Sequence, residues 1–382
     1  MSPMWKFLVY TGIIACGAST LSFQIGDKQF SHVWRTKQAM PSKRSDLTAT
    51  TLGDAIYLVG GCDGDQEWNG NAGMYLCTGI TKESVKYLPL TDSYETLPEA
   101  PRSRYRHAAA AIGSKIYVLG GCGIDDSIIA EVDIFDTQSG EWSTLAEPMP
   151  SATSDLSVFV HNNKIYALGG YDRPNYNASS AMMIFDPSTD AWSVGPSLTQ
   201  GRGDAAAVMA GGLAYALGGF HHDDWSFPMD HLESFDPTSP ANGWSIRQGM
   251  SLARGDKAVA VLNDLLHVVG GESKNENYQS VPLMDVEVYE AAADRWHNGG
   301  SIPSHRFRFV AAAHRSSIFI FGGQGKLSGD YEADGSSYPV LDTVDEYEES
   351  QGTAIESNRA HATEKLSFVA MLVAFLFIQI CN

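Results

Sequence analysis

The chain has 382 residues, of which 43% are hydrophobic, and this is enough to build a large core. It carries 45 acidic against 26 basic residues, a formal net charge of −19. A nucleic-acid backbone attracts the opposite sign, so this balance argues against a nucleic-acid partner. It favours solubility and is compatible with a cationic partner or a divalent metal.

Residues 1–20 predict a secretory signal peptide. One early cation, Lys6, precedes an apolar run from Phe7 to Ala15, and small residues begin at Gly17. That order is typical of segments removed on secretion. The chain is therefore expected to enter the secretory pathway.

Glycine doublets then divide residues 31–349 into similar units about 50 residues long. Each doublet ends a short apolar stretch rich in β-branched and aromatic residues, which predicts a buried strand. A tight turn and a strand of small apolar residues precede each stretch. The doublets are Gly60-Gly61, Gly120-Gly121, Gly169-Gly170, Gly218-Gly219, Gly270-Gly271 and Gly322-Gly323.

A second pattern follows the doublets. An aromatic residue stands seven positions before a Trp, as Phe185 does before Trp192, and an Arg follows ten positions later, as at Arg202. The first unit has Tyr94 in place of the Trp, the second has Thr153 in place of the Arg, and the fourth has a spacing of nine before Trp244. Each unit is therefore predicted to contain four strands, named a to d in chain order. Strand a holds the small apolar residues, strand b ends at the glycine doublet, strand c carries the aromatic residue and strand d carries the Trp. In the sixth unit the Trp is missing after Tyr347, and Trp34 at the other end of the chain supplies it.

The doublets with their spaced Tyr and Trp residues resemble the kelch-repeat family over residues 31–349. The resemblance implies an all-β fold, a six-bladed kelch β-propeller closed by an N-terminal strand, which leaves only short sheet edges. In kelch domains that bind peptides, basic residues at the start of the innermost strand contact the ligand at the channel mouth. Arg106 and Arg308 match that place here.

Charged residues recur at two fixed places before the doublets, two positions apart and so on the same side of the strand. Sixteen residues before each doublet stand Arg44, Arg104, Thr153, Arg202, Arg254 and Arg306. Fourteen residues before stand Asp46, Arg106, Asp155, Asp204, Asp256 and Arg308. Two interpretations stay open, structural ion pairs and ligand contact. The candidate ligand residues are Arg106, Arg308, Arg104, Arg306, Asp46 and Asp204. The four Asp residues depart from the family pattern and argue against recognition of an acidic peptide.

The links between strands b and c open on the same face as this charged ring. The first link, 62–83, and the sixth, 324–342, are the longest and belong to neighbouring blades. Long loops on a rigid scaffold commonly carry function. This long-loop face is therefore the predicted binding surface.

Three cysteines remain outside the two terminal segments that we expect to be removed, which contain Cys16 and Cys381. A disulfide between Cys62 and Cys77 would staple the first long loop. Pairing of Cys62 with Cys122, and the absence of any bridge, are the alternatives.

Several eye-catching motifs have simpler explanations. Arg202-Gly203-Asp204 and Arg254-Gly255-Asp256 spell the integrin tripeptide, but they occupy a repeat position where Arg-x-Asp is already explained. The cluster 221–224 with His231, and the oxygen-rich loop 63–71, could ligate metal. Solvated loops of this composition are commoner, so no metal site and no cofactor are predicted.

The C-terminus predicts lipid attachment. Residues 350–365 form a polar spacer with small residues, and 366–382 form a hydrophobic tail, short for a membrane span. Gly352 and Asn358 are the rival attachment sites for a glycosylphosphatidylinositol (GPI) anchor. A short membrane helix, or neither, are the alternatives. Asn177 lies in a glycosylation sequon.

These features favour a non-catalytic binding module on the outer face of the plasma membrane, with an extracellular protein or glycan as partner. No catalytic residue set recurs at a credible spacing, and fold alone supplies no chemistry. The alternatives are a secreted enzyme on a kelch scaffold acting on a carbohydrate, of the oxidase or sialate epimerase type, and a structural matrix or wall glycoprotein.

Overall fold

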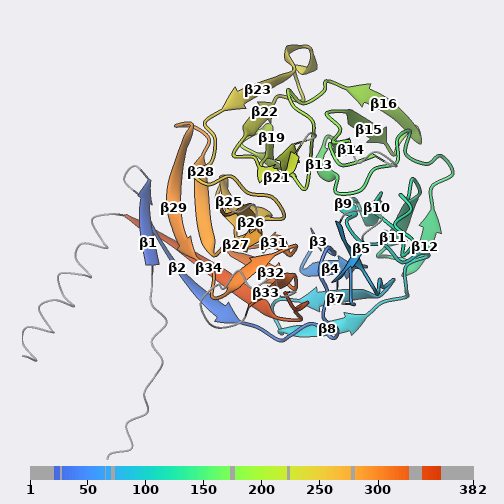
Figure 1. Ribbon diagram of the computed structural model, residues 1–382, viewed down its shortest axis with the longest axis horizontal. Coiled ribbons are helices and arrows are strands. Elements are labelled where there is room, and N and C mark those ends of the chain that lie inside the picture. The colour runs from blue at the N-terminus through green and yellow to red at the C-terminus, as the bar shows by residue number, and fades with distance from the viewer. Residues whose placement is uncertain are drawn as a thin grey trace, which may run out of the picture.

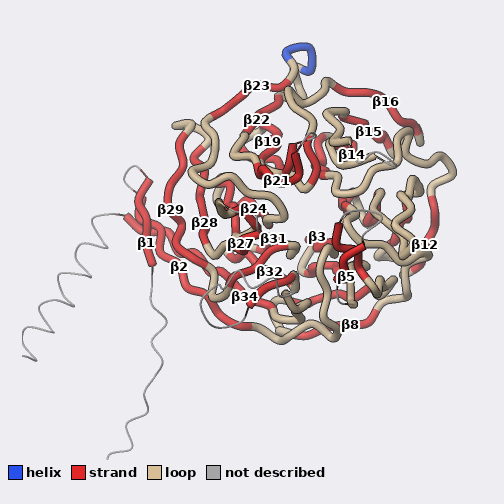
Figure 2. The backbone as a smooth tube through the Cα atoms, in the orientation of Figure 1, coloured by secondary structure: helices blue, strands red, loops and turns tan. Residues whose placement is uncertain are grey.

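The computed structural model describes residues 21–25, 28–64, 66–69, 74–172, 177–221, 224–276, 280–326 and 338–353. One short 3-10 helix, η1 (Pro240–Asn242), interrupts a set of elements that are otherwise all strands (Figure 2). Six large sheets stand side by side around a central axis (Figure 1). The all-β propeller fold expected from the sequence is therefore confirmed.

Each large sheet is one blade, with strand a nearest the axis. Blade one contains β3 (Thr48–Leu52), β4 (Ala55–Val59), β7 (Ser84–Leu88) and β8 (Ser93–Thr96). Blade two contains β9 (Ala108–Ile112), β10 (Lys115–Leu119), β11 (Val132–Asp136) and β12 (Glu141–Thr144). Blade three contains β13 (Ser157–His161), β14 (Lys164–Leu168), β15 (Met182–Asp186) and β16 (Ala191–Gly195).

The later blades repeat this order. Blade four contains β18 (Ala206–Ala210), β19 (Leu213–Leu217), β22 (Leu232–Phe235) and β23 (Trp244–Arg247). Blade five contains β24 (Ala258–Leu262), β25 (Leu265–Val269), β28 (Asp285–Glu290) and β29 (Arg295–Ser301). Blade six contains β31 (Val310–His314), β32 (Ser317–Phe321), β34 (Val344–Thr353), β2 (Lys28–Thr36) and β1 (Leu21–Ile25).

The remaining strands lie in the links on the long-loop face. They are β5 (Gln66–Asn69), β6 (Met74–Cys77), β17 (Arg202–Gly203), β20 (Phe220–His221), β21 (Asp224–Pro228), β26 (Glu272–Lys274), β27 (Ser280–Pro282), β30 (His305–Phe307) and β33 (Gln324–Lys326). A small bridge also joins the start of each strand a to the residue after the doublet, as in Ser45 with Cys62. The charged ring and the b–c links therefore share one face.

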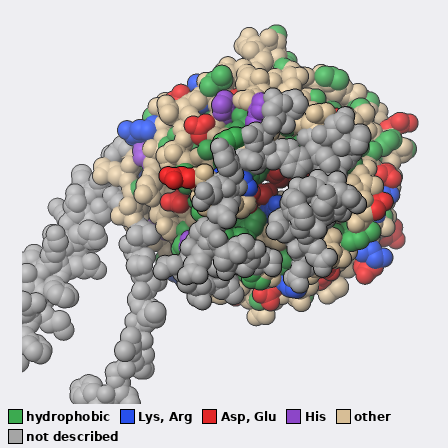
Figure 3. All heavy atoms as spheres, in the orientation of Figure 1, with side chains coloured by type: hydrophobic (Ala, Val, Ile, Leu, Met, Phe, Trp, Pro, Cys, Tyr) green, Lys and Arg blue, Asp and Glu red, His purple; other side chains and the backbone are tan. Residues whose placement is uncertain are grey.

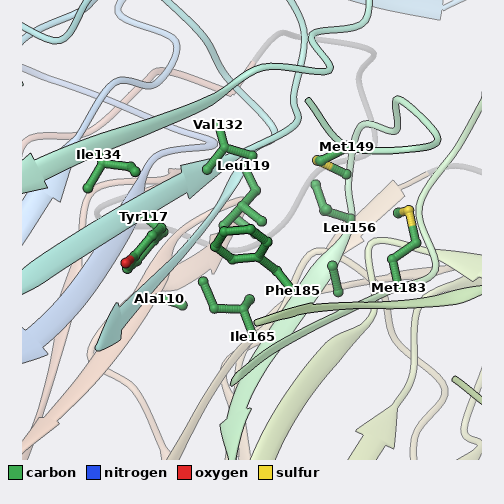
Figure 4. Close-up of a cluster of buried hydrophobic side chains, with 12 residues drawn as sticks. Ala110, Tyr117, Leu119, Val132, Ile134, Met149, Leu156, Ile165, Met183 and Phe185 are labelled. Carbon is green, nitrogen blue, oxygen red and sulfur yellow. The ribbon is translucent and has the colours of Figure 1, made fainter. Parts of the chain in front are cut away.

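The core lies between neighbouring blades. Tyr117 and Leu119 of blade two pack against Ile165 and Phe185 of blade three (Figure 4). The alternation of residues along each strand sends side chains to both neighbouring blades, so every sheet is buried on two faces. The a–b turns use left-handed residues, such as Asn162 and Asn163 at φ 48° and 56°.

Blade six joins the two ends of the described chain. β2 pairs with β34, and Trp34 lies opposite Tyr347. The sheet is longer than the sequence boundaries of 31 and 349, since β1 begins at Leu21 and β34 ends at Thr353. The extra hairpin is held because Phe23 stacks on Phe30 at 5.1 Å and both join the core of blade five.

Several terminal predictions lie outside the described residues, namely the signal peptide at 1–20, Asn358 and the tail at 366–382. In the described part of the chain, no helix has the length and apolar character needed to cross a membrane. Gly352 lies in β34, where it is paired with Gln29.

Candidate ligand site at the mouth of the propeller

The arginines sixteen residues before the doublets are buried inside the blades. They are Arg44, Arg104, Arg202, Arg254 and Arg306, each 0–1% exposed. Each one meets an acid carried on or just before strand c of its own blade. The five acids are Glu83, Asp133, Glu233, Glu287 and Asp345.

These pairs are structural. Arg254 Nη2 lies 2.6 Å from Glu287 Oε1, and its Nη1 donates to the Gly270 and Asp285 carbonyls at 3.0 Å. Burial lowers the pKa of Arg104 and of Arg202 to about 10, so both remain charged at neutral pH. Arg104 and Arg306 therefore have a structural explanation and no surface for a ligand, and we leave them out of the ligand set.

The residues two positions later form a ring around the axis. Asp46, Arg106, Asp155, Asp204, Asp256 and Arg308 all adopt left-handed backbone conformations, with φ between 48° and 56°. Backbone hydrogen bonds of 2.8–3.2 Å link neighbouring ring residues. Each acceptor is the carbonyl of the ring residue in the preceding blade, and the donors are the N–H groups of Asp46, Arg106, Asp155, Asp204 and Arg308. Asp tolerates this conformation better than most residues, which helps to explain its recurrence here.

Side chains of both signs meet within this ring. Arg308 Nε donates to Asp256 Oδ2 at 3.1 Å, and Arg106 Nε lies 3.8 Å from Asp155 Oδ1. Figure 3 shows this face, with basic, acidic and apolar side chains meeting in the central hollow. Because the two arginines flank Asp46, positive charge lies on one side of the ring and carboxyl groups on the other.

Burial shifts the pKa of several charged groups in and beside the ring. Burial, with Asp155 and Asp256 close by, holds the pKa of Asp204 well above its ordinary value. Burial outweighs the two arginines at Asp46 and raises its pKa to about 6. Burial also lowers the pKa of Lys257, which donates to the Asp204 carbonyl at 3.0 Å, to about 7.

Aromatic residues surround the ring. The Arg106 guanidinium lies 5.3 Å from the centre of the Tyr105 ring, and that of Arg308 lies 5.6 Å from the centre of the Phe307 ring. At the equivalent places in blades four and five stand Gly203 and Gly255. A Cβ on Gly203 would overlap the ring of Tyr171, and one on Gly255 would overlap the ring of Phe220.

Cys62 and Cys77 form a disulfide in the structure, with their Cα atoms 5.9 Å apart. The bridge packs with Tyr105 and the buried Cys122, whose pKa burial raises to about 11. This is the loop-stapling pair considered from the sequence, and it fixes the base of the first long loop beside Arg106.

The two motifs considered as metal ligands, 221–224 with His231 and 63–71, form no metal site in the described residues. No group of three or more His, Cys, Asp or Glu side chains in the described ranges is placed to hold a metal ion. His222 and Asp223, and Asp65, Gly70 and Asn71 of the first loop, lie outside those ranges. The Asn177 backbone N–H donates to Asp172 Oδ1 at 2.9 Å, in a short loop on the same face.

Lys257, Glu272 and Tyr171 also lie at the mouth and were not predicted from the sequence. One signal was present for Lys257: the residue after each ring position is apolar in blades one, three, four and six, and only His107 and Lys257 are polar. Tyr171 and Glu272 directly follow a glycine doublet, a position at which no single residue type is common to all six blades. No repeat-based argument selects them.

A family model described as the Attractin/LZTR1 beta-propeller matches residues 71–331, more than half of the chain. The chain belongs to this propeller family. A solved structure of YjhT has a TM-score of 0.65 and 19% identity, and the match covers 80% of this chain and 96% of that one. At this identity the likeness shows the fold alone.

Several curated proteins are similar in sequence. Kelch-like protein terF of Aspergillus terreus is 28% identical over 66% of this chain and 58% of its own length. Beta-scruin of Limulus polyphemus is 26% identical over 73% of this chain and 30% of its own. Human Kelch-like protein 23 is 24% identical over 66% and 44%. The matches thus span less than two thirds of each relative.

Proposed function

We propose that this propeller is a non-catalytic binding module of the cell surface that holds an extracellular protein or glycan at its long-loop face. One observation carries the proposal: six blades bring two arginines, four aspartates and a lysine together at the mouth, fixed by backbone hydrogen bonds. The likeness to kelch-like and scruin proteins favours binding over catalysis.

The course of β34 supports display of this face away from a membrane. The strand starts beside the mouth, where Gln324 bridges to Val340, and ends beyond Glu349, whose N–H donates to Ser316 in an a–b turn. A lipid on Gly352 would therefore lie on the face opposite the mouth.

Crosslinked capture on intact cells tests the binding role. Arg106→Asn with Arg308→Asn removes both mouth cations, and Asn suits their left-handed backbone. The matched control is Arg295→Asn with Arg315→Asn, which changes the net charge equally at exposed positions away from the mouth. We expect the mouth variant to lose most of the captured partner and the control to keep it. Equal capture by both variants contradicts the proposal.

Phosphatidylinositol-specific phospholipase C tests the anchor separately. We expect the enzyme to release the wild-type protein from cells into the medium. Retention on the membrane after treatment would replace the lipid with a membrane helix, and leave the binding role of the mouth unaffected.

A further inference from the structure

The links between strands b and c build an uneven collar around the mouth. Four links carry strands of their own: β5 and β6 in blade one, β20 and β21 in blade four, β26 and β27 in blade five, and β33 in blade six. Within the described residues, the links of blades two and three contain no strand. The collar is therefore lowest over these two neighbouring blades, and we expect a partner to reach the ring from that side.

The link of blade three contains the only N-glycosylation sequon of the sequence, Asn177-Ala178-Ser179. Asn177 is partly exposed, and its side-chain amide has no hydrogen-bond partner among the described residues. The disulfide between Cys62 and Cys77 independently indicates folding in an oxidising compartment, and N-linked sugars are added in the same compartment of eukaryotic cells. Motif, exposure and compartment therefore agree at this asparagine.

The ring below the collar has two unlike halves in blade order. The arginine half consists of Arg308, Asp46 and Arg106, and the acidic half consists of Asp155, Asp204 and Asp256. Blade three and its link belong to the acidic half. Blade two and its link belong to the arginine half.

Backbone contacts fix the sequon beside the acidic half. Ala178 forms a bridge with Tyr171, whose ring packs over Gly203 of blade four. The Ser179 carbonyl accepts a hydrogen bond from the Arg202 N–H at 3.1 Å. Arg202 and Gly203 directly precede the ring residue Asp204, so the sequon has a defined place at the rim of the mouth.

We propose that Asn177 carries an N-linked oligosaccharide that covers the acidic half of the mouth and leaves the arginine half open to the partner. The inference rests on the proposed binding role of the mouth. An N-glycan is bulky and polar, so it fills the low collar over blade three. The partner is left with the low collar over blade two, beside Arg106.

The modification is a group transfer at the side-chain amide of Asn177. The amide nitrogen forms a bond to the first sugar carbon of an oligosaccharide on a polyprenyl diphosphate, a donor that the secretory pathway supplies. The bond from that carbon to the diphosphate breaks, and the diphosphate leaves with the electron pair. The amide gives up one proton, so the transfer requires no oxidant or reductant.

Peptide-N-glycosidase F tests the modification on the full chain made in eukaryotic cells. We expect the enzyme to increase the electrophoretic mobility of the wild type and to convert residue 177 to Asp, which peptide mass spectrometry detects. Ser179→Ala should abolish both effects, and Ser179→Thr, which preserves the sequon, should retain them. Wild-type protein with an unmodified Asn177 overturns the proposal.

Removal of the sugar tests where it lies. Asn177→Gln and Ser179→Ala should each capture the partner at or above the wild-type level, because the arginine half is unchanged. A fall in capture in both variants, but not in Ser179→Thr, would mean that the partner holds the sugar itself. That result would also overturn the proposal.

A relocated sugar tests the open half, in the Ser179→Ala background. Asp125→Asn turns residues 125–127 into a sequon in the link of blade two, where Cys122 bridges to Ile128 and to Tyr105, the neighbour of Arg106. We expect the glycosylated molecules to lose most of the captured partner. Asp125→Gln removes the same charge without adding a sugar and should keep it. Full capture with a sugar on the link of blade two contradicts the proposal.

A second relocated sugar is the control for size. Arg315→Asn creates a sequon at 315–317, in an a–b turn on the face opposite the mouth, and its glycosylated molecules should capture the partner normally. The outcome is separable from the proposed function. If capture needs Arg106 and Arg308 while Asn177 is bare, only the glycan inference fails. If capture needs neither arginine, the binding role of the mouth fails whatever Asn177 carries.

Discussion

Gly203 lies beneath the aromatic ring of Tyr171, a residue of the preceding blade, so closely that a methyl group on Gly203 would overlap the ring. Gly255 stands in the same relation to Phe220. In two other blades the glycine position is aromatic: Tyr105 follows the blade of Cys62, which it contacts, and Phe307 follows the blade of Glu272. The remaining two blades carry Ser45 and Ser154 there. Both Arg-Gly-Asp tripeptides therefore result from packing, since their arginines are buried and their glycines make room for a ring.

Gly203→Ala should destabilise the propeller through this overlap. Overpacking of a tight site typically costs about 1–3 kcal/mol, and urea unfolding would measure the loss. In a Tyr171→Ala background the same substitution should cost well under 1 kcal/mol, because the ring is gone. An equal cost in both backgrounds would show that the glycine is required by its backbone and not by the ring.

Arg254→Leu should be among the most damaging single changes in blade five. It leaves Glu287, 5% exposed, without its guanidinium, and breaking a buried pair costs about 3–5 kcal/mol. Arg295→Leu is the matched control, since Arg295 is exposed, its partner Glu290 keeps a contact with His297, and such a pair is worth under about 1 kcal/mol. Unfolding free energies of similar size for the two variants would contradict the structural role of the buried ring.

The repeat made much of this arrangement predictable. A common spacing placed the doublets, the strands and both charged positions, because equivalent residues in a propeller meet equivalent surroundings. The acids that pair with the arginines were less predictable, since strand c offers Asp in some blades and Glu in others. The hairpin of β1 and β2 has no counterpart in the other blades, so the repeat spacing could not predict that it starts at Leu21.

The protonation of Asp204 could not be predicted for a different reason. It depends on burial and on the order of residues around the ring, which places Asp204 between two other carboxyl groups and next to neither arginine. Sequence spacing shows that six residues are equivalent, but their electrostatic differences arise only when the ring is assembled.

His107 should make stability depend on acid pH. It is buried, its Nε2 lies 3.1 Å from the Val59 carbonyl, and burial together with Arg104 lowers its pKa from 6.5 to about 3. The folded state therefore prefers the neutral ring. The stabilisation is complete above pH 6.5 and is lost as pH falls toward 3, because the unfolded chain binds the proton first.

His107→Gln keeps a donor for the Val59 carbonyl and removes the titration. Between pH 6 and pH 4 the wild type should lose about 1.4 kcal/mol per pH unit more than the variant. Urea unfolding at half-unit pH steps measures the difference, in which the other titrating groups cancel. Parallel curves for the two proteins would assign the acid sensitivity to other groups.

Glu349 ties the last strand to blade five. Its carboxylate accepts hydrogen bonds from Asn263 Nδ2 at 2.7 Å and from Tyr347 Oη at 3.1 Å, and lies 3.2 Å from His267 Nε2. These contacts hold the pKa of Glu349 below its ordinary value despite burial. The stabilisation is therefore present above about pH 4.5 and fades as pH falls through the lowered pKa.

Glu349→Gln should lower the unfolding free energy at pH 7 by about 1–3 kcal/mol, because a charged acceptor of hydrogen bonds is lost inside the closure. Glu348→Gln, one residue away, removes the same charge from an exposed pair with Arg35 and should cost under about 1 kcal/mol. Hydrogen exchange should show faster opening of β2 and β34 in Glu349→Gln alone. Because β34 leads to the proposed lipid site, loss of this contact would loosen the strand before that site, while the charged mouth on the other face keeps its ring. Uniformly faster exchange in all six blades would instead mean that the propeller opens as a single unit.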